Sequence, residues 1–529
     1  MKIKFLAFSY NKPYSFNPIY YWLKSFYKKN GKHFDQYEWL PTEYFYDENI
    51  VDRIISEGTD ILCLSVYLWN FESLMKVARE VADKDPGIHI IIGGPDCHAN
   101  TEPDWFERYP FIDFAVYGDG EKAFSDLLDW FAFPNEIDYR SIPNIVVSDH
   151  KSKHEILKFR DYNSYSPYLD LQEEFLKDYF GFKNKVNGAY VYLPYERTRG
   201  CMYSCAFCDW QANLHYKVNT RINDYKEEID FFCKNGIRSM HIDANVGMMK
   251  EDIPLYEYVY EKMKEYDLSY MPTEPRNMAK LHKDKVSIIY DILCEASPYY
   301  NLKVSLQSIY EDVLSNIDRP DVPWHSHKQI IKNTKLKHPH VKVVPELIMG
   351  LPGMTFDRIL ETHIEFLDVP MTHIYSYEWI LLKKSPAYSK DYRDKHNLKV
   401  TKTFYPSIFT GLDSSTIKLK DFLEDPNIPI NKNQAYFIDM VYDHNLGIQG
   451  VIYNKLLTRV YNSFVAQNRI SDLKDYYLKN NNRFLDISLL EANKQSDYYN
   501  QYGFYLWGSI EDDYIRSYEI TLDRHIENG

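Results

Sequence analysis

The sequence lacks long apolar runs. No stretch approaches the ~20 consecutive apolar residues that a membrane-spanning helix needs, and no apolar N-terminal segment is followed by a cleavage site. These absences predict a soluble protein that resides in the cytoplasm and does not contact a membrane.

Cysteine is scarce and odd in number. The 529 residues include seven cysteines, and three of them fall within one short segment. Secreted disulfide frameworks normally use an even set of cysteines, so this usage favours a reducing cytosol. The other four adjoin apolar runs and are predicted to be core residues: Cys63, Cys97, Cys233 and Cys294.

The sequence also lacks a long block of lysine and arginine, and its net charge is −14. Proteins that bind nucleic acid usually need a basic face to neutralise phosphates. Nucleic acid is therefore disfavoured as a substrate, although a local basic patch is compatible with an acidic total. The 48 tyrosines and 29 phenylalanines would suit a peptide or a planar small molecule, with most rings expected in the core.

The length exceeds what a single hydrophobic core normally supports, so several domains are expected. Changes in pattern along the chain predict an N-terminal domain, a polar and tyrosine-rich linker, a second α/β domain and a mainly helical C-terminal region. Their predicted boundaries are 1–148, 149–187, 188–388 and 389–529.

Residues 1–148 alternate between apolar runs and amphipathic helical patterns. The runs cover 3–8, 61–66, 88–92 and 111–116. Helical spacing relates two apolar sets, Leu74, Val77, Ala78 and Val81, and Phe124, Leu127, Leu128 and Phe131. Continuous apolar strands separated by such helices predict a doubly wound, Rossmann-like parallel sheet that is covered on both faces.

Glycine and polar residues follow these strands. In an open α/β sheet the ligand crevice lies beyond the carboxyl ends of the strands. The candidate crevice residues are Ser9, Tyr10, Ser65, Tyr67, Gly93, Gly94, Tyr117, Gly118 and Glu121. Two purely structural alternatives are a tight turn at 93–94 and a helix start with an acidic first turn at 118–121.

The three clustered cysteines are Cys201, Cys205 and Cys208. Three thiolates at this spacing can hold three corners of an iron–sulfur cube and leave the fourth iron open. A zinc site or a chance cluster of buried cysteines is the alternative. Zinc usually needs a fourth ligand, for which His215 is the only nearby candidate.

The spacing Cys-x3-Cys-x2-Cys, with Phe207 before the last cysteine, resembles the signature of the radical S-adenosylmethionine (SAM) enzymes. The resemblance implies a 4Fe-4S cluster whose open iron binds the amino and carboxylate groups of SAM. Reductive cleavage of SAM then yields a deoxyadenosyl radical. It also implies an external one-electron reductant such as flavodoxin or ferredoxin.

The N-terminal domain resembles the cobalamin-binding domain that precedes the barrel in one branch of these enzymes, the class B radical SAM methyltransferases. Gly-Gly-Pro at 93–95, followed by Val-Tyr-Gly-Asp-Gly-Glu at 116–121, carries the resemblance. It implies that the crevice residues border cobalamin. The Asp-x-His-x-x-Gly motif is missing after the first strand, so cobalamin would bind without a protein histidine, and a domain that binds nothing is the alternative.

Residues 188–388 are expected to form a partial (β/α)6 barrel, with strands at 189–193, 239–242, 302–306, 341–348 and 374–382 among its six units. The radical SAM resemblance implies that SAM is bound by Asp243, Asn245, Glu274, Ser305, Gln307, Arg319 and Glu346, beside a glycine turn at 350–353. As alternatives, these side chains form helix caps or turns. No catalytic residue is assigned.

The region 389–529 is expected to close the barrel mouth and shape the substrate pocket, or to act as a structural cap. These features predict a cobalamin-dependent radical SAM methyltransferase that acts on an unactivated carbon of a small molecule or peptide. The alternatives are a non-methylating radical rearrangement, cyclisation or oxidation, a tRNA methylthiotransferase, and a metal-binding protein without enzymatic activity.

Overall fold

The computed structural model divides the chain into two compact units. The first contains Met1–Met202 and Asn213–Asp243, and the second contains Tyr203–Ala212, Ala244–Pro406 and the described residues after 434. The structure describes residues 1–9, 14–97, 103–155, 157–186, 191–199, 201, 204–209, 219–220, 225–237, 240–242, 252–266, 283–296, 301–319, 323–369, 371–406, 435–466 and 468–473.

A seven-stranded sheet forms the centre of the first unit, in the order β3-β1-β4-β5-β6-β7-β8. The first five strands are parallel, and the last two are antiparallel additions. The strands are β1 Lys2–Leu6, β3 Glu38–Trp39, β4 Ile61–Ser65, β5 His89–Gly93, β6 Phe114–Val116, β7 Ile145–Val147 and β8 His150–Lys151. This sheet confirms the predicted doubly wound fold. From β1 the sheet continues to β3 on one side and to β4 on the other. The topological switch point therefore lies between β1 and β4, and folds of this kind bind ligands at that point.

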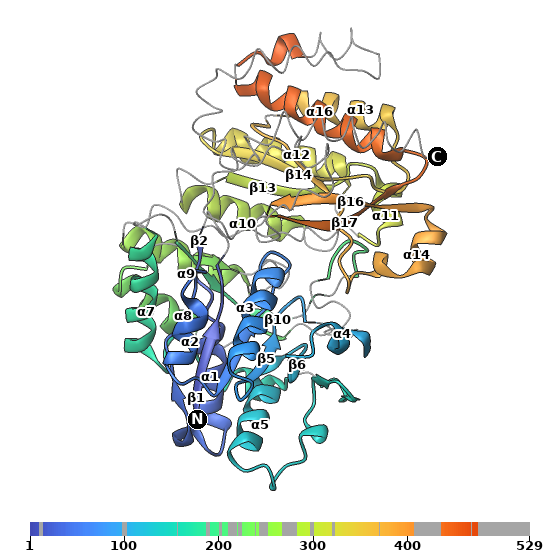
Figure 1. Cartoon of the computed structure of the whole chain (residues 1–529). Helices are drawn as coiled ribbons and strands as arrows, with labels where there is room; N and C mark the ends of the chain where they lie inside the picture. The colour runs from blue at the N-terminus through green and yellow to red at the C-terminus, as the bar shows by residue number, and fades with distance from the viewer. Residues whose placement is uncertain are drawn as a thin grey trace. The chain divides into compact units, whose positions relative to one another are not determined.

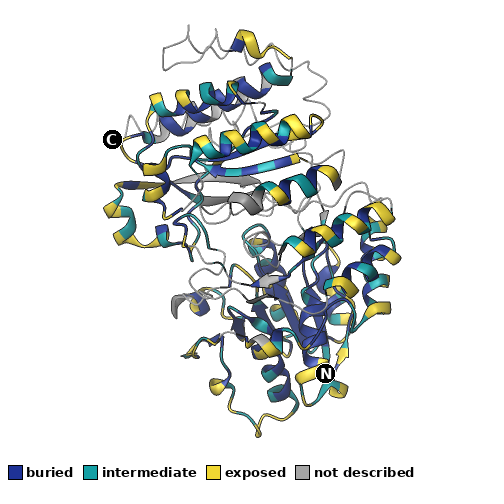
Figure 2. Cartoon of the chain, turned by 180° about the vertical axis from the view of Figure 1, so that it is seen from behind, coloured by how far each residue is buried: buried dark blue, intermediate teal, exposed yellow. Residues whose placement is uncertain are grey.

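Helices cover this sheet with the faces that the sequence predicts (Figures 1 and 2). All five residues of β4 are buried, as expected for a strand covered on both sides. The helices are α1 Ile19–Asn30, α2 Ile50–Ser56, α3 Phe71–Lys84, α4 Pro103–Arg108 and α5 Gly120–Ala132. Helix α3 buries its whole predicted apolar set, and α5 buries its set except Phe131, which is half-buried.

The segment predicted as a linker packs into the first unit. It contains α6 Phe159–Tyr162 and α7 Gln172–Lys185. The carboxylate of Asp178 accepts hydrogen bonds from the hydroxyls of Tyr21 at 2.9 Å and Tyr44 at 2.6 Å. Burial raises the pKa of Asp178, and it raises the pKa of both tyrosines well above their ordinary value. This polar contact lies within a cluster of aromatic rings that fixes α7 to the N-terminal domain.

A three-stranded sheet in the order β12-β9-β2 completes the first unit. Strand β9, Val191–Tyr195, pairs in parallel with β12, Met240–Ile242, on one edge and with β2, Tyr14–Ser15, on the other. Helix α8, Tyr225–Lys234, connects β9 to β12 along the chain. A two-residue ribbon, β10 Thr198–Arg199 with β11 Asn219–Thr220, leads into the cysteine segment.

The second unit contains a parallel sheet in the order β13-β14-β15. Its strands are β13 Asn301–Gln307, β14 Lys342–Met349 and β15 Tyr375–Glu378. Its helices are α9 Asp252–Glu265, α10 Lys283–Ala296, α11 Glu311–Asn316, α12 Trp324–Lys337 and α13 Phe356–Leu367. Strands and helices alternate along this part of the chain, as expected for residues 188–388.

The C-terminal region contains the expected helices and an antiparallel hairpin that the sequence analysis did not predict. The helices are α14 Lys390–Lys395 and α16 Gly447–Ala466. The hairpin pairs β16, Leu398–Pro406, with β17, Ala435–Asp443. Both strands are rich in aromatic and β-branched residues, which favour strands. They are far apart in the sequence, so no local pattern predicts that they pair. Among the residues that the structure describes, none of the helices combines the length and hydrophobicity that crossing a bilayer requires.

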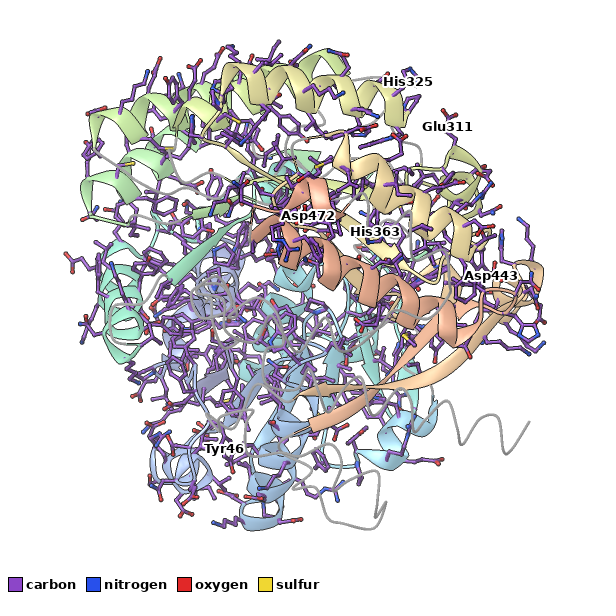
Figure 3. The ribbon with its side chains drawn as sticks, turned by 90° about the horizontal axis from the view of Figure 1, so that it is seen from above. Tyr46, Glu311, His325, His363, Asp443 and Asp472 are labelled. Carbon is purple, nitrogen blue, oxygen red and sulfur yellow. The ribbon has the colours of Figure 1, made fainter. Side chains whose placement is uncertain are left out.

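Helices α13 and α16 lie side by side, joined by the buried imidazole of His363 (Figures 1 and 3). Its Nδ1 lies 2.8 Å from the carbonyl oxygen of Ile359, which only accepts, so we assign the proton to Nδ1. Its Nε2 lies 3.0 Å from the hydroxyl of Thr458 on α16 and accepts from it. Burial lowers the pKa of His363 to about 4, and burial likewise lowers the pKa of His373 to about 4.

These two histidines predict a loss of stability in mild acid. In the unfolded chain each would have a pKa of about 6.5, so between pH 6.5 and 4 the unfolded state binds more protons than the folded state. Their contribution is complete above pH 6.5 and is lost as the pH falls towards 4. The cost for each is on the order of 3 kcal/mol.

Urea unfolding of the wild type and of His363→Gln between pH 7.5 and pH 4.5 checks this expectation. The variant should lose part of the pH dependence of the unfolding midpoint. His325→Gln, at an exposed position on α12, should retain all of it (Figure 3). An identical pH dependence in the wild type and in His363→Gln would contradict the assignment.

Candidate cofactor sites

The first candidate site lies at the carboxyl ends of β1 and β4, where the buried side chain of Asn70 joins the two strands. Its Oδ1 accepts from the backbone nitrogen of Tyr67 at 2.7 Å. Its Nδ2 donates to the carbonyl oxygens of Ser65 at 3.0 Å and Phe8 at 3.3 Å. Sequence analysis missed this residue, although an asparagine just before a helix that follows a strand is a recognisable signal.

The predicted polar residues at these strand ends are already hydrogen-bonded within the unit. The hydroxyl of Ser9 donates to the carbonyl oxygen of Ser15 at 2.7 Å, and the side chain of Asn17 donates to the hydroxyl of Ser65 at 3.2 Å. The ring of the partly buried Tyr67 stacks on that of Trp69 with centroids 4.4 Å apart. Tyr10, also predicted here, lies outside the described residues.

The glycine pair after β5 lies against the end of β4. The carbonyl oxygen of Gly93 accepts from the backbone nitrogen of Val66 at 2.7 Å. Gly94 has a φ of 113°, and a Cβ atom there would stand 2.5 Å from the carbonyl oxygen of Val66. Because that contact is with backbone, it cannot be relieved by moving a side chain. Glycine is therefore required at 94 to bring the loop against the β4 strand end.

Gly94→Ala should lower the free energy of unfolding by more than the roughly 1–3 kcal/mol that a strained backbone conformation alone costs. Gly181→Ala is the matched control, because no atom lies within 4 Å of a Cβ at that position in α7. A helical Gly→Ala change should instead stabilise the protein by about 0.5–1 kcal/mol. Urea unfolding of both variants measures the difference, and equal midpoints would contradict the close approach at 94.

The turn after β6 contains the predicted residues Tyr117, Gly118 and Glu121. Tyr117 is buried, and its hydroxyl donates to the carbonyl oxygen of Ser152 at 2.8 Å. Gly118 has a φ of 72°, which lets the chain reverse into α5. Glu121, in the first turn of α5, is 3% exposed, so its carboxylate lies inside the unit.

The carboxylate of Glu121 forms an ion pair with a buried arginine, Arg199. The Arg199 guanidinium lies 2.5 Å from Glu121 Oε1, 3.3 Å from Asp119 Oδ1 and 2.8 Å from Glu196 Oε2. Burial alone would lower the pKa of Arg199, but these three carboxylates hold it well above its ordinary value. The sequence motif at 116–121 contains Asp119 and Glu121, but their pairing with Arg199 was not predicted, because only the tertiary fold brings β10 to the start of α5.

The cysteine segment continues from β10. Cys201 and Cys208 are partly exposed, and Cys205 is buried. The backbone nitrogen of Cys208 donates to the carbonyl oxygen of Cys205 at 3.0 Å, which closes a turn between the two residues. Ala206 fixes this turn, because its nitrogen donates to Ile317 at 2.9 Å and its carbonyl oxygen accepts from Ala387 at 3.1 Å.

The three cysteines are assigned to different units: Cys201 belongs to the first unit, and Cys205 and Cys208 belong to the second. Within the described ranges, no group of three His, Cys, Asp or Glu side chains is gathered as a metal site. The assembly of the three thiolates around one cluster therefore stays a prediction that rests on their spacing.

Arg319 provides the electrostatic setting of Cys205. Its Nη1 lies 3.9 Å from Cys205 Sγ, and its Nη2 donates to the carbonyl oxygen of Ser305 at 3.2 Å. A buried guanidinium beside a thiol favours the thiolate, which is the form that binds iron. The residues around Cys205 therefore fit a thiolate ligand of an iron–sulfur cluster.

Three more of the seven residues predicted to bind SAM meet beside this arginine, which is itself one of the seven. The hydroxyl of Ser305 donates to Glu346 Oε2 at 2.5 Å across the neighbouring strands β13 and β14. Gln307 has a φ of 60° at a bulge in β13, and its Nε2 donates to the carbonyl oxygen of Ser305 at 3.3 Å. Ser305 is thus the common partner of Gln307, Arg319 and Glu346. The other three predicted residues, Asp243, Asn245 and Glu274, lie outside the described residues.

The predicted glycine turn follows β14. Gly350 and Gly353 have φ values of 79° and 92°, a region that favours glycine. The backbone nitrogen of Gly353 donates to Oδ2 of Asp443, at the end of β17, at 2.8 Å (Figure 3). Asp443 was not predicted, because it lies 90 residues further along the chain.

Known proteins resemble both the N-terminal domain and the chain as a whole. A family model described as "B12 binding domain" matches residues 34–128, which extend from β3 into α5. The chain is 28% identical, over 73% of its length, to 2-(S-pantetheinyl)-carbapenam-3-carboxylate methyltransferase of Streptantibioticus cattleyicolor. It is 30% identical, over 58% of its length, to the cobalamin-dependent radical SAM methyltransferase TokK of Streptomyces tokunonensis. The chain is thus similar in sequence to two methyltransferases, one of them named as a cobalamin-dependent radical SAM enzyme, and its residues 34–128 match a B12-binding domain.

Solved structures agree with this radical SAM fold. The radical SAM methyltransferase TsrM from Kitasatospora setae, with cobalamin and a 4Fe-4S cluster bound, matches with a TM-score of 0.61 and 11% identity, covering 90% of this chain and 99% of that one. The cobalamin-dependent SAM radical enzyme OxsB matches with a TM-score of 0.60 and 13% identity, covering 99% of this chain and 81% of that one. At these identities the structural likeness concerns the fold.

The chain spans about half the length of the curated relatives it matches, 54% of the first and 44% of the second.

Proposed function

We propose that this protein is a cobalamin-dependent radical SAM methyltransferase that acts on an unactivated carbon of a small molecule or peptide. The observation that carries the proposal is the order of features in one chain: a B12-binding domain followed by the Cys-x3-Cys-x2-Cys segment. The two curated relatives, at 28% and 30% identity, are both named as methyltransferases, which favours methyl transfer over a different radical reaction.

The cluster, SAM and cobalamin would each be held by residues named above. Cys201, Cys205 and Cys208 would hold the 4Fe-4S cluster. The strand-end residues Ser305, Gln307, Arg319 and Glu346, with Asp243, Asn245 and Glu274, would bind SAM. Residues of the β1, β4, β5 and β6 ends would line the cobalamin site. When bound, these groups supply the electron that cleaves SAM and the carrier for its methyl group.

The protein's own residues supply charge and exclude water. Arg319 and Glu346 are both buried, so their opposite charges act in a medium of low dielectric constant. A guanidinium suits a carboxylate, and a carboxylate suits an ammonium or hydroxyl group; SAM carries all three. Burial of both residues also keeps water away from a reactive radical.

The relatives and the net charge support a small-molecule substrate. One relative acts on a pantetheinylated carbapenam, and TsrM was solved with tryptophan as its substrate. Both are small molecules. The net charge of −14 weighs against a nucleic acid. An external one-electron reductant, such as flavodoxin or ferredoxin, would supply the electrons.

The test uses the full chain, purified and reconstituted without oxygen, with a chemical reductant, cobalamin and SAM that carries a trideuterated methyl group. A pantetheinyl carbapenam, tryptophan and bulk tRNA are the first substrate probes. We expect both S-adenosylhomocysteine and 5′-deoxyadenosine by mass spectrometry, and the labelled methyl group on a small-molecule product.

The products separate the alternatives. Deoxyadenosine without S-adenosylhomocysteine would favour a non-methylating radical reaction. A thiomethyl group on tRNA would indicate a methylthiotransferase. No cleavage of SAM in the presence of cluster and reductant would contradict the proposal.

A further inference from the structure

We propose that Arg199 is a positioning residue that couples occupancy of the B12 crevice to the cysteine segment. The identity of the two ligands rests on the proposed function. The inference itself concerns a buried cluster of charges that joins the turn after β6 to the strand that leads into Cys201.

The cluster connects segments that are far apart in sequence. Arg199 lies in β10, whereas Asp119 and Glu121 lie 80 and 78 residues earlier, in the turn that precedes α5 and in its first helical turn. Only 9% of the Arg199 side chain is exposed, and its two remote partners are 3% and 4% exposed. The fork of guanidinium donors therefore joins the crevice turn to the cysteine segment away from solvent.

The two remote partners of Arg199 are themselves fixed. The hydroxyl of Tyr165 donates to Glu121 Oε1 at 2.8 Å, and Asp119 Oδ2 accepts from the backbone nitrogen of Leu157 at 2.7 Å. The guanidinium carbon also lies 5.2 Å from the ring centroid of Trp22 and 4.7 Å from that of Tyr162. Planar stacking between rings suits arginine and not lysine, so the position of the guanidinium is determined by packing as well as charge.

Such a cluster is better suited to fixing geometry than to adding stability. A buried ion pair loses hydration that its Coulomb attraction only partly restores, so replacement by apolar residues is often neutral or stabilising. Arg199, in contrast, is two residues before Cys201, and one residue spans at most about 3.6 Å of chain. A shift of the crevice turn that moves Arg199 is therefore separated from the first thiol by only two residues of chain.

This geometry gives Glu121 a different task from the one expected from sequence. Its carboxylate is occupied by Arg199 and Tyr165 inside the unit. Glu121 acts through Arg199 on the cysteine segment, while the glycines beside it shape the crevice. The B12-binding match ends at residue 128 and so includes Asp119 and Glu121 but not Arg199.

The test is a binding cycle on the full chain, kept without oxygen. The affinity for hydroxocobalamin is measured by its absorbance, once with the cluster reconstituted and once without it. In the wild type the two affinities should differ by about fivefold or more, the usual lower range for coupled sites. In Arg199→Met the two affinities should become equal, and Arg199→Lys should restore only part of the difference.

Arg53→Met is the matched control. Arg53 belongs to the same unit and binds two carboxylates, Glu43 and Asp47, but it lies in α2 and is about one third exposed. Its loss should leave the difference between the two affinities unchanged. If Arg199→Met does not fold, Glu121→Gln keeps the shape and the guanidinium, and it should reduce the difference in the same direction.

The outcomes separate this inference from the proposed function. A wild type that binds cobalamin and cluster without any coupling would overturn the role of Arg199 and leave the function intact. So would coupling that survives in Arg199→Met or, where that variant is unfolded, in Glu121→Gln. A wild type that holds neither cobalamin nor an iron–sulfur cluster would overturn the proposed function itself.

Discussion

Replacing Cys205 with alanine should remove the iron–sulfur cluster and stop reductive cleavage of SAM. Three thiolates are the minimum that holds a cube with one open iron, so the loss of one leaves too few ligands. Cys205 is the buried member of the trio, and Arg319 stands 3.9 Å from its sulfur. The loss of activity should exceed the roughly 10–100-fold that removal of a supporting residue costs at a metal site. Iron content and deoxyadenosine formation measure it.

Cys294→Ala is the matched control for this experiment. Cys294 is fully buried in α10, and burial raises the pKa of its thiol to about 12, so it stays protonated. A protonated core thiol is a poor metal ligand. The variant should keep its iron and its activity and lose only about 1 kcal/mol of stability from the smaller side chain. If Cys205→Ala behaved like Cys294→Ala, the cysteine segment would not be the cluster site.

Arg319→Met should produce the second large effect, on both the cluster and SAM. A positive charge beside a cysteine ligand stabilises the more negative, reduced cluster, so its removal should move the midpoint potential to more negative values. The carbonyl oxygen of Ser305 also loses one of its two side-chain donors and keeps Gln307, which loosens the strand end where Glu346 lies. We expect SAM cleavage to fall about 10–100-fold. An EPR-monitored redox titration and deoxyadenosine formation measure the two effects.

Two further variants define what the arginine contributes. Arg319→Lys keeps the charge but loses the fork that reaches both Cys205 and Ser305, so it should recover the potential better than the activity. Arg469→Met removes an exposed arginine that binds Asp472 in the same unit, and it should change neither quantity. An unaltered midpoint potential in Arg319→Met would mean that the guanidinium does not face a cluster ligand.

The parts of the fold that follow from local periodicity could be predicted from sequence. The four consecutive apolar residues of β4 and the buried face of α3 appear directly in the order of residues, because burial on both faces of a strand and on one face of a helix leaves different patterns. The β16–β17 hairpin could not, because 28 residues separate its strands and no local turn signal specifies their pairing.

The residues of the candidate cofactor sites also divide into those that could be predicted from sequence and those that depend on the tertiary fold. Ser305 and Glu346 were predicted from the radical SAM resemblance, which assigns function to the carboxyl ends of the strands, and the two side chains are in contact there. Asn70, Arg199 and Asp443 were not predicted as site residues, because each acts on a partner that the tertiary fold supplies.

The most direct test is the EPR spectrum of the reduced, anaerobically reconstituted full chain, recorded with and without SAM. The account predicts the signal of a reduced 4Fe-4S cluster whose g values change when SAM is added, because SAM binds the iron that the three cysteines leave open. A spectrum without an iron–sulfur signal, or one that SAM leaves unchanged, would contradict it.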